Sequence, residues 1–367
     1  MLKKIWRVCK ILLISLFSLI SLLLILWWIN SPGTAEPIKN STGKDLPKSI
    51  SVIDTVILGG LKQYLIIRGS DSTKPIMLFV HGGPGGPEAV MMKEMNPGIE
   101  EDFVMVYWEQ RGSGKSFSKS IPIETMNLDQ FVQDANELSK ILIQRYRRDK
   151  IFIMGHSWGS LLGLLTAYRH PENFHAYFGI GQIAAQYRGE YVSYQWAMDQ
   201  AKQRNDTMGV RELSNMKFPD SPATNKDWDD FLGMERNYVM KYGGGATHQM
   251  TSIIPFVKMV FLAHEYTIQE KLNYVKAADY SMPFLWPEVI KSNLFAGIDS
   301  MGVPVYVLQG RFDYQTPYPV AKDFVHQLKA PDKTFITFEQ SAHSPNMEEP
   351  MFFNTTVRSL AEKALHR

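Results

Sequence analysis

The chain has 367 residues, of which 45% are hydrophobic, and its 39 lysines and arginines nearly balance its 37 aspartates and glutamates. This is ordinary globular composition with ample material for a large core. The sequence has no stripe of basic residues, which argues against a nucleic-acid partner. The single cysteine, Cys9, excludes an intramolecular disulfide and argues against a cysteine-based metal site.

The N-terminal segment differs from the rest of the chain. Residues 11–29 carry no charge and are apolar apart from three serines. At about 1.5 Å per residue they would reach roughly 28 Å, close to the hydrocarbon thickness of a bilayer. Basic residues precede them, which predicts a cytoplasmic N-terminus at 1–10, a membrane anchor at 11–29 in contact with lipid, and the remainder outside. The alternative is secretion after signal-peptide cleavage, although the apolar region of a signal is normally shorter, about 7–15 residues.

Residues 30–48 are rich in Ser, Thr, Pro, Gly and Lys, and we expect a flexible linker there. Short apolar runs then alternate with stretches of helical spacing. Strands are expected at 51–58, 61–68, 76–80, 103–108, 151–154, 174–180, 303–309 and 334–338. Helices are expected at 128–145, 158–169, 319–328 and 350–365. This alternation predicts an α/β fold whose mostly parallel sheet has helices on both faces.

The alternation stops between residues 183 and 299. Long aromatic and Met-containing stretches there, such as 187–198, 231–242 and 253–274, predict a helical insertion with a loop or hinge at Gly243-Gly244-Gly245. The predicted organisation is therefore a core made of 49–182 and 300–367, interrupted by a helical cap at 183–299.

The segment Gly155-His156-Ser157-Trp158-Gly159 directly follows an apolar run and precedes a helical pattern. In this strand–turn–helix setting, Gly-x-Ser-x-Gly forms a sharp turn that lifts the serine hydroxyl above the end of the sheet. The alternative is a glycine-rich turn that carries a bystander serine.

A serine nucleophile needs a base to take its proton and an acid to orient that base. Asp313 follows the C-terminal end of one expected strand, and His343 follows the end of the last one. Both therefore fall at the sheet edge that carries Ser157, in the chain order Ser, Asp, His. Taken alone, Asp313 could be a helix N-cap and His343 a surface histidine.

An oxyanion hole needs backbone N–H groups aimed at the developing negative charge. Trp158, the residue after the serine, supplies one. The second is expected in the loop His81-Gly82-Gly83-Pro84-Gly85-Gly86-Pro87, which follows the strand 76–80. We favour the N–H of Gly83, with Gly82 as the alternative, because proline has no N–H to donate.

Two glycine-rich segments imitate other motifs. Gly112–Ser116 resembles the end of a phosphate-binding loop, but Glu109 stands where that motif needs glycine. The triple glycine at 243–245 follows no strand, so it is not a dinucleotide fingerprint. No His and carboxylate cluster has metal-ligand spacing, so neither a metal nor a cofactor is expected.

Together these segments resemble the α/β-hydrolase fold and, within it, the prolyl iminopeptidase-like serine peptidases. The family's HGGPG, DQRGxGxS and GHSWGS segments and its acid loop are similar to residues 81–85, 108–116, 155–160 and 310–313. The resemblance covers about residue 50 to the C-terminus, and Glu109 replaces the family's usual aspartate. It implies a Ser157–Asp313–His343 triad with Gly83 and Trp158 as oxyanion donors. In the family, cap carboxylates bind the substrate's free α-amino group; the candidates here are Glu190, Glu235 and Glu265.

The sequence therefore predicts a membrane-anchored serine hydrolase that removes N-terminal residues from short peptides through an acyl-enzyme. A carboxylesterase for small acyl esters would use the same triad. A non-catalytic binding module on the same scaffold is a third hypothesis. Epoxide and haloalkane hydrolases are disfavoured because they carry aspartate at the position of Ser157. The sequence does not define the oligomeric state.

Overall fold

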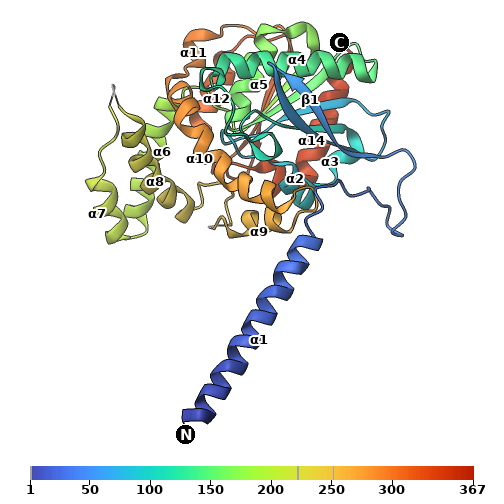
Figure 1. Cartoon of the computed structure of the whole chain (residues 1–367). Helices are drawn as coiled ribbons and strands as arrows, with labels where there is room; N and C mark the ends of the chain where they lie inside the picture. The colour runs from blue at the N-terminus through green and yellow to red at the C-terminus, as the bar shows by residue number, and fades with distance from the viewer. Residues whose placement is uncertain (1, 221–222, 251) are drawn as a thin grey trace.

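The computed structural model describes residues 2–220, 223–250 and 252–367 (Figure 1). Residue 1 of the expected cytoplasmic segment, and residues 221, 222 and 251 of the expected cap, lie outside the described residues. A sheet of eight strands forms the centre of this described part, in the order β1-β2-β4-β3-β5-β6-β7-β8. The strands are β1 (Ile50–Leu58), β2 (Leu61–Gly69), β3 (Ile76–Val80), β4 (Val104–Glu109), β5 (Ile151–His156), β6 (Phe174–Ile180), β7 (Val305–Gly310) and β8 (Lys333–Phe338).

The sheet is mostly parallel, as expected from the alternation of strands and helices. β1 pairs with β2 and β2 with β4 in antiparallel fashion, and every pairing from β4 to β8 is parallel. Gly59-Gly60 forms the two-residue turn between β1 and β2, with Leu58 opposite Leu61. The predicted α/β fold is therefore confirmed.

Helices cover both faces of the sheet. The helices of the core are α2 (Ala89–Met95), α3 (Ile99–Asp102), α4 (Leu128–Tyr146), α5 (Trp158–Arg169), α12 (Tyr318–Gln327), α13 (Pro345–Glu348) and α14 (Pro350–Leu365). Along β3, Leu78 and Val80 belong to the apolar cluster that includes residues of α4, α5 and α12, whereas Met77 and Phe79 belong to the cluster with α2 and α14. Because both of its faces are buried, the central strand β3 is apolar throughout.

Short helices escaped the sequence analysis. α2, α3 and α13 have four to seven residues, too few to show a helical period. Three single turns of 3-10 helix are also present: η1 (Gly114–Ser116), η2 (Ile123–Thr125) and η3 (Pro171–Asn173).

The segment between β6 and β7 is helical. We call Gln186–Gly297 the insertion; it comprises α6 (Gln186–Gln203), α7 (Thr207–Asn215), α8 (Asn225–Lys241), α9 (Ile254–Leu262), α10 (Ile268–Lys291) and α11 (Leu294–Gly297). Within the aromatic stretch 253–274, two helices, α9 and α10, are separated by residues 263–267. There Thr267 caps α10 by accepting a hydrogen bond from the N–H of Glu270, whose side chain accepts from the N–H of Thr267.

The N-terminal helix α1 (Leu2–Ile29) projects from the domain (Figure 1). An 18-residue window within Lys4–Ile29 has a mean hydropathy of 2.7, and none of that window is buried. By length and composition, this helix could cross a membrane or act as a signal sequence. It begins nine residues before the expected anchor, so the basic residues at 3–10 lie on the same helix.

The first part of the expected linker, at residues 33–36, makes hydrogen bonds to the domain. The N–H groups of Gly33 and Thr34 both donate to the carbonyl of His264, at 3.0 and 3.1 Å. The backbone carbonyl of Glu36 accepts from the Ser51 hydroxyl and from Arg68. Composition alone does not reveal these partners, which come from distant parts of the chain.

Candidate active site

Ser157 lies at the turn between β5 and α5. Its backbone has φ +54° and ψ −121°, a conformation that non-glycine residues rarely adopt and that is typical of the strained nucleophile elbow. The N–H of Ser157 donates to the carbonyl of Ile180 at the end of β6, 2.9 Å away, which fixes the turn to the sheet.

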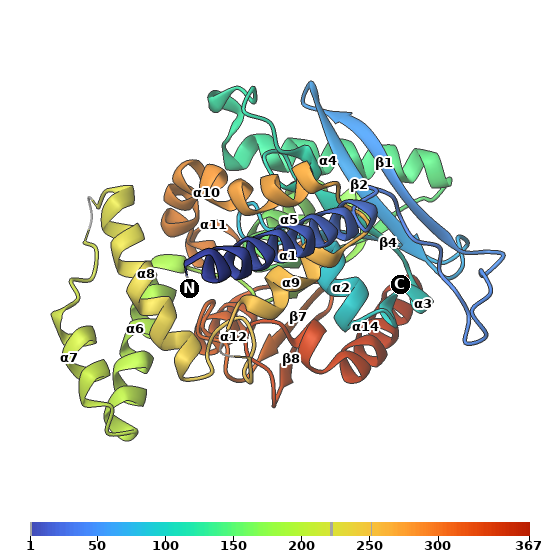
Figure 2. The same cartoon turned by 60° about the horizontal axis from the view of Figure 1, so that its bottom comes forward.

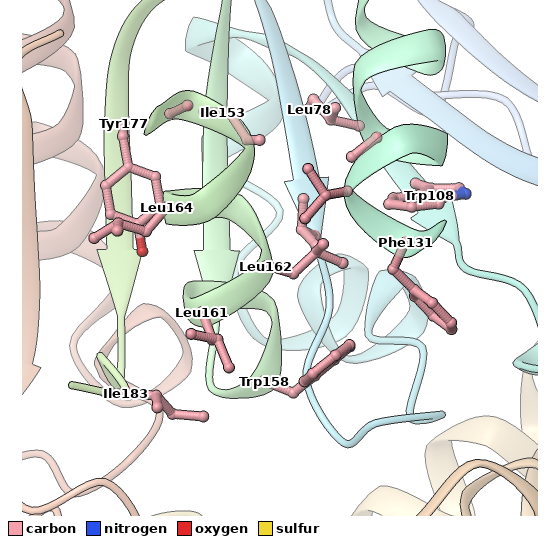
Figure 3. Packing of buried hydrophobic residues seen from close by; sticks show 14 of the residues in the cluster. Leu78, Trp108, Phe131, Ile153, Trp158, Leu161, Leu162, Leu164, Tyr177 and Ile183 are labelled. Carbon is pink, nitrogen blue, oxygen red and sulfur yellow. The ribbon is translucent and has the colours of Figure 1, made fainter. Parts of the chain in front are cut away.

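The two flanking glycines are needed because backbones approach closely here. A Cβ atom on Gly155 would lie 2.1 Å from the carbonyl oxygen of Gly159, and one on Gly159 would lie 1.9 Å from that of Val80. Figure 3 shows how α5 packs here: Leu161, Leu162 and Leu164 lie among strand residues such as Ile153 and Leu78, and Trp158 lies at the beginning of the helix.

Asp313 and His343 meet beyond the ends of β7 and β8. Oδ2 of Asp313 lies 2.9 Å from Nδ1 of His343. The aspartate is fully buried and also accepts hydrogen bonds from Gln309, Gln315 and Thr316. These donors hold the carboxylate in one orientation, so it can fix the imidazole ring.

Asp313 contacts only one of the two ring nitrogens of His343, Nδ1. Nε2 is buried and has no hydrogen-bond partner among the described residues, Ser157 included. Contacts of this kind are often long in a free enzyme and shorten only in the reacting complex. The structure thus shows an imidazole oriented by Asp313 and a serine in a strained backbone conformation.

The loop after β3 offers one of its two candidate N–H groups. The N–H of Gly82 donates to Oε1 of Glu88 at 2.7 Å, so it is not available to a substrate oxygen. In the part of the chain that the structure describes, the N–H groups of Gly83 and Trp158 have no acceptor. The geometry therefore favours Gly83 over Gly82 as the partner of Trp158.

Gln110 links the two segments that carry these N–H groups. Its amide nitrogen donates to the carbonyl of His81 at 3.0 Å, and its amide oxygen accepts from Nε1 of Trp158 at 2.9 Å. The neighbouring Arg111 makes a fully buried, bidentate ion pair with Asp134 of α4, at 2.8 and 2.9 Å. This segment therefore braces the site, which explains its place among the family motifs.

A second buried histidine lies beside the triad. Nδ1 of His156 lies 2.7 Å from Oε2 of Glu88, and Nε2 lies 3.0 Å from the carbonyl oxygen of His343. Burial lowers the pKa of His156, but the Glu88 carboxylate outweighs it and holds that pKa above its ordinary value. Burial likewise raises the pKa of Glu88, but His156 and the Gly82 N–H hold it below the usual range. The pair therefore ties the Gly82–Gly83 loop to the His343 loop.

The glycine loop of the insertion contacts both triad loops. The carbonyl of Gly244 accepts from the N–H of Tyr314 at 3.1 Å, and the carbonyl of Gly245 accepts from the N–H of His343 at 3.2 Å. The sequence predicts only a hinge or loop at these glycines. Their contacts instead make the insertion part of the site's support.

Glu190 of α6 and Glu235 of α8 are brought together above the Asp313 loop. Both are fully buried, and Arg236 forms an ion pair with each. The Ser193 hydroxyl lies between Glu235 and the carbonyl of Tyr314, the residue after Asp313. Burial raises the pKa of Glu235 to about 7. One oxygen of Glu190 is buried without a partner among the described residues.

Glu265, the third amine-binding candidate, belongs to a different network. It pairs with Lys93 of α2 at 2.8 Å, and Lys93 also pairs with Glu36 of the linker at 2.9 Å. Glu109 is close by: it accepts from the hydroxyl of Tyr266 and from the N–H of Lys115, and burial raises its pKa to about 7. The structure thus joins two of the three candidates and separates the third.

The site contains several residues that sequence reasoning missed. They are Glu88, His156, Arg236 and the carbonyls of Gly244 and Gly245. Arg236 follows Glu235 directly, so its neighbour could have drawn attention to it. Nothing in the local sequence indicates the other contacts, because their partners are distant along the chain. Within the described residues, no group of three or more His, Cys, Asp or Glu side chains could hold a metal ion.

The comparisons with known proteins agree with this geometry. Residues 75–350 match the alpha/beta hydrolase fold family. The chain is 30% identical over 311 residues to a probable aminopeptidase, YbaC, of Bacillus subtilis, covering 84% of this chain and 96% of the relative. It is 23% identical to a proline iminopeptidase of Heyndrickxia coagulans, covering 80% and 92%. The chain therefore belongs to the α/β-hydrolase family and is prolyl iminopeptidase-like.

Solved structures show the same fold. The proline iminopeptidase of Mycobacterium smegmatis superposes with a TM-score of 0.59 at 14% identity, covering 85% of this chain and 98% of that one. An esterase of Exiguobacterium antarcticum gives 0.54 at 15% identity, covering 84% and 98%. Family and fold together identify the protein as a hydrolase.

Proposed function

We propose that the protein is a membrane-anchored serine aminopeptidase that releases N-terminal residues from short peptides. The observation that carries the proposal is the buried Glu190–Glu235 pair, which lies against the loop of Asp313. An α-ammonium group bound there would bring the first peptide bond of a substrate near Ser157. The named activities of the relatives support the same class of reaction.

In the proposed mechanism, Ser157 attacks the carbonyl carbon of the first peptide bond while Nε2 of His343 takes its proton. Asp313 holds the imidazole in the required orientation and stabilises its positive charge. The N–H groups of Gly83 and Trp158 stabilise the oxyanion of the tetrahedral intermediate. His343 then gives its proton to the leaving amine, and water hydrolyses the acyl-enzyme by the same sequence.

The charges around Arg236 fit one ammonium group. Two ionised glutamates and one guanidinium leave a net charge of −1, and one Glu190 oxygen lacks a partner. A buried site of this kind stabilises a single positive charge. Because the pKa of Glu235 is about 7, protonation at lower pH cancels the net charge. KM for peptide-like substrates should therefore rise as pH falls from 8 to 6.

An esterase acting on small acyl esters is the second candidate. The observation that favours it is Arg236 itself, which already pairs with both carboxylates and so supplies partners that an ammonium group would otherwise provide. A neutral ester would use the same Ser157 chemistry and leave this ion cluster unchanged.

A panel of aminoacyl-arylamides and small acyl esters, assayed with the full chain in detergent, separates the two activities. Ser157→Ala should abolish hydrolysis of both, and survival of activity would refute the serine mechanism, as would failure of a fluorophosphonate probe to label Ser157. Glu190→Gln should raise KM for arylamides and leave ester hydrolysis unchanged. Asp229→Asn, an exposed change on α8, is the matched control. Ester hydrolysis without arylamide hydrolysis would favour the esterase.

We also propose that α1 is an uncleaved anchor with its N-terminus in the cytoplasm and the hydrolase domain outside. Its uncharged apolar run at residues 11–29, long enough to span a bilayer, supports this assignment. The N-terminal peptide of protein purified from membranes should contain residues before Ile29. A mature N-terminus beyond residue 30 would instead identify a cleaved signal and a secreted enzyme.

A further inference from the structure

Side-chain contacts hold the C-terminal end of α1, and the residues that follow it, directly against the insertion. The ring of Trp27 stacks on that of Phe261 in α9, with centroids 5.7 Å apart and planes 7° from parallel, and its Nε1 donates to the carbonyl of Phe261 at 3.0 Å. Lys271 of α10 donates to the Ser31 hydroxyl at 2.7 Å and to the same Phe261 carbonyl at 3.0 Å. If α1 crosses a membrane, α9 must therefore lie at the membrane surface.

α9 has two faces of different character. Phe256, Met259 and Val260 pack inward, toward the core or in contact with it. Ile254 is 73% exposed and Val257 40%, and both precede Phe261, by seven and four residues, so they continue the face that meets Trp27. The outer face of α9 is thus an apolar stripe that begins at the anchor.

α10 extends the stripe. Leu272 and Val275 are exposed on this helix beside Lys271, which binds the end of α1. Lys258 on α9 and Lys276 on α10 are also exposed and flank the apolar side chains. An apolar face bordered by lysines is typical of helices that lie in the membrane interface, where lysine reaches the headgroups.

Figures 1 and 2 show α9 and α10 on the side of the domain from which α1 emerges. We propose that the stripe Ile254, Val257, Leu262, Leu272 and Val275 lies in the outer interface of the bilayer as a second membrane contact. The proposal rests on the proposed anchor. The occupant is the bilayer, because the exposed stripe is continuous with the contact that holds the anchor's end. A second copy of this chain is an alternative outcome of the test.

Single labelled cysteines in the full chain test the proposal. Cys9→Ser removes the natural cysteine; Ile254→Cys then probes the stripe, Leu13→Cys the anchor, and Ile57→Cys an exposed control. Ile57 is 59% exposed near the β1–β2 turn, where the N–H of Gly59 donates to Glu137 of α4, on the side of the domain away from α1 (Figure 1). Each variant receives an environment-sensitive fluorophore and is reconstituted in phosphatidylcholine vesicles with or without doxyl-labelled lipid.

The doxyl lipid should quench the labels at residues 13 and 254 at least twofold and leave the label at 57 unchanged. Quenching at 13 with none at 254 would overturn the proposal while leaving the anchor intact. No quenching at 13 would overturn the anchor, and the proposal with it. A signal at 254 that depends on protein density and not on doxyl lipid would assign the stripe to a second copy.

A paired substitution gives a second readout. Ile254→Glu together with Val257→Glu should reduce lipid quenching of a label at Leu262→Cys, because carboxylates resist entry into the interface. Both positions are exposed, so the fold should persist. Ile123→Glu, at a 61% exposed position in η2, is the control. Unchanged quenching in the double variant would contradict membrane contact by this stripe.

Discussion

Replacing Glu88 with glutamine should destabilise the protein most between about pH 4.5 and 6.5. His156 is buried, and the Glu88 carboxylate that faces it at 2.7 Å holds the pKa of His156 above its ordinary value. His81 is equally buried, and burial lowers its pKa to about 4. Against an ordinary value near 6.5, and at about 1.4 kcal/mol per pKa unit, a charged imidazole in such surroundings costs roughly 3 kcal/mol.

The pKa shifts of both partners determine how the stability from this pair depends on pH. The pKa of His156 is raised, so its contribution is fully present below its unfolded value and is lost as pH rises through its folded value. The pKa of Glu88 is lowered, so its contribution is present above its unfolded value and is lost as pH falls. Glutamine can still accept from the Gly82 N–H. Glu88→Gln should therefore lower the free energy of unfolding by about 3 kcal/mol, at the lower end of the range for a broken buried ion pair.

Urea unfolding of the full chain in detergent, followed by tryptophan fluorescence, measures the loss at pH 5.5, 7 and 9. The difference between wild type and Glu88→Gln should be largest at pH 5.5 and narrow at pH 9. Glu101→Gln, an exposed change on the neighbouring α3, should have no such effect. A loss that is the same at all three pH values would refute the assignment of an ionised Glu88–His156 pair.

Other changes probe the acid, the buried network and the elbow. Asp313→Asn should lower kcat for arylamide hydrolysis by about 10⁴-fold, because the imidazole loses its orienting partner. Glu109→Gln should raise the free energy of unfolding at pH 8 by up to about 3 kcal/mol, because the pKa of Glu109 is raised to about 7 and stability is lost as pH rises through that value. Gly159→Ala should prevent folding, because its Cβ would meet the Val80 carbonyl at 1.9 Å, whereas Gly233→Ala on α8, with nothing within 4 Å, should stabilise by about 0.5–1 kcal/mol.

For each of these substitutions, one experimental result would contradict the expected outcome. A normal kcat in Asp313→Asn would remove the aspartate from the mechanism. The advantage of Glu109→Gln should vanish in urea unfolding at pH 4.5, and a constant advantage would mean that ionisation is not its cause. Thermal unfolding compares the two alanine variants, and equal melting temperatures would show that the elbow tolerates a side chain.

Features with a local cause were predictable from the sequence. The strand at 76–80 and the helix at 158–169 match β3 and α5 residue for residue, because their apolar spacing reports burial directly. The turn at Ser157 and the positions of Asp313 and His343 were also predictable, since each of these residues follows the end of an expected strand. The pairing of Glu88 with His156 was not, because 68 residues separate them and no periodicity links them.

The insertion shows most clearly where local patterns end. Its helical character was predicted from its long aromatic stretches. The hydrogen bonds that attach it to the rest of the protein were not, because they join residues distant along the chain. The carbonyls of Gly244 and Gly245 hold the loops of Asp313 and His343, while α9 and α10 hold the end of α1. A rigid swing of the whole insertion would break both sets of contacts and release the loops that orient the triad.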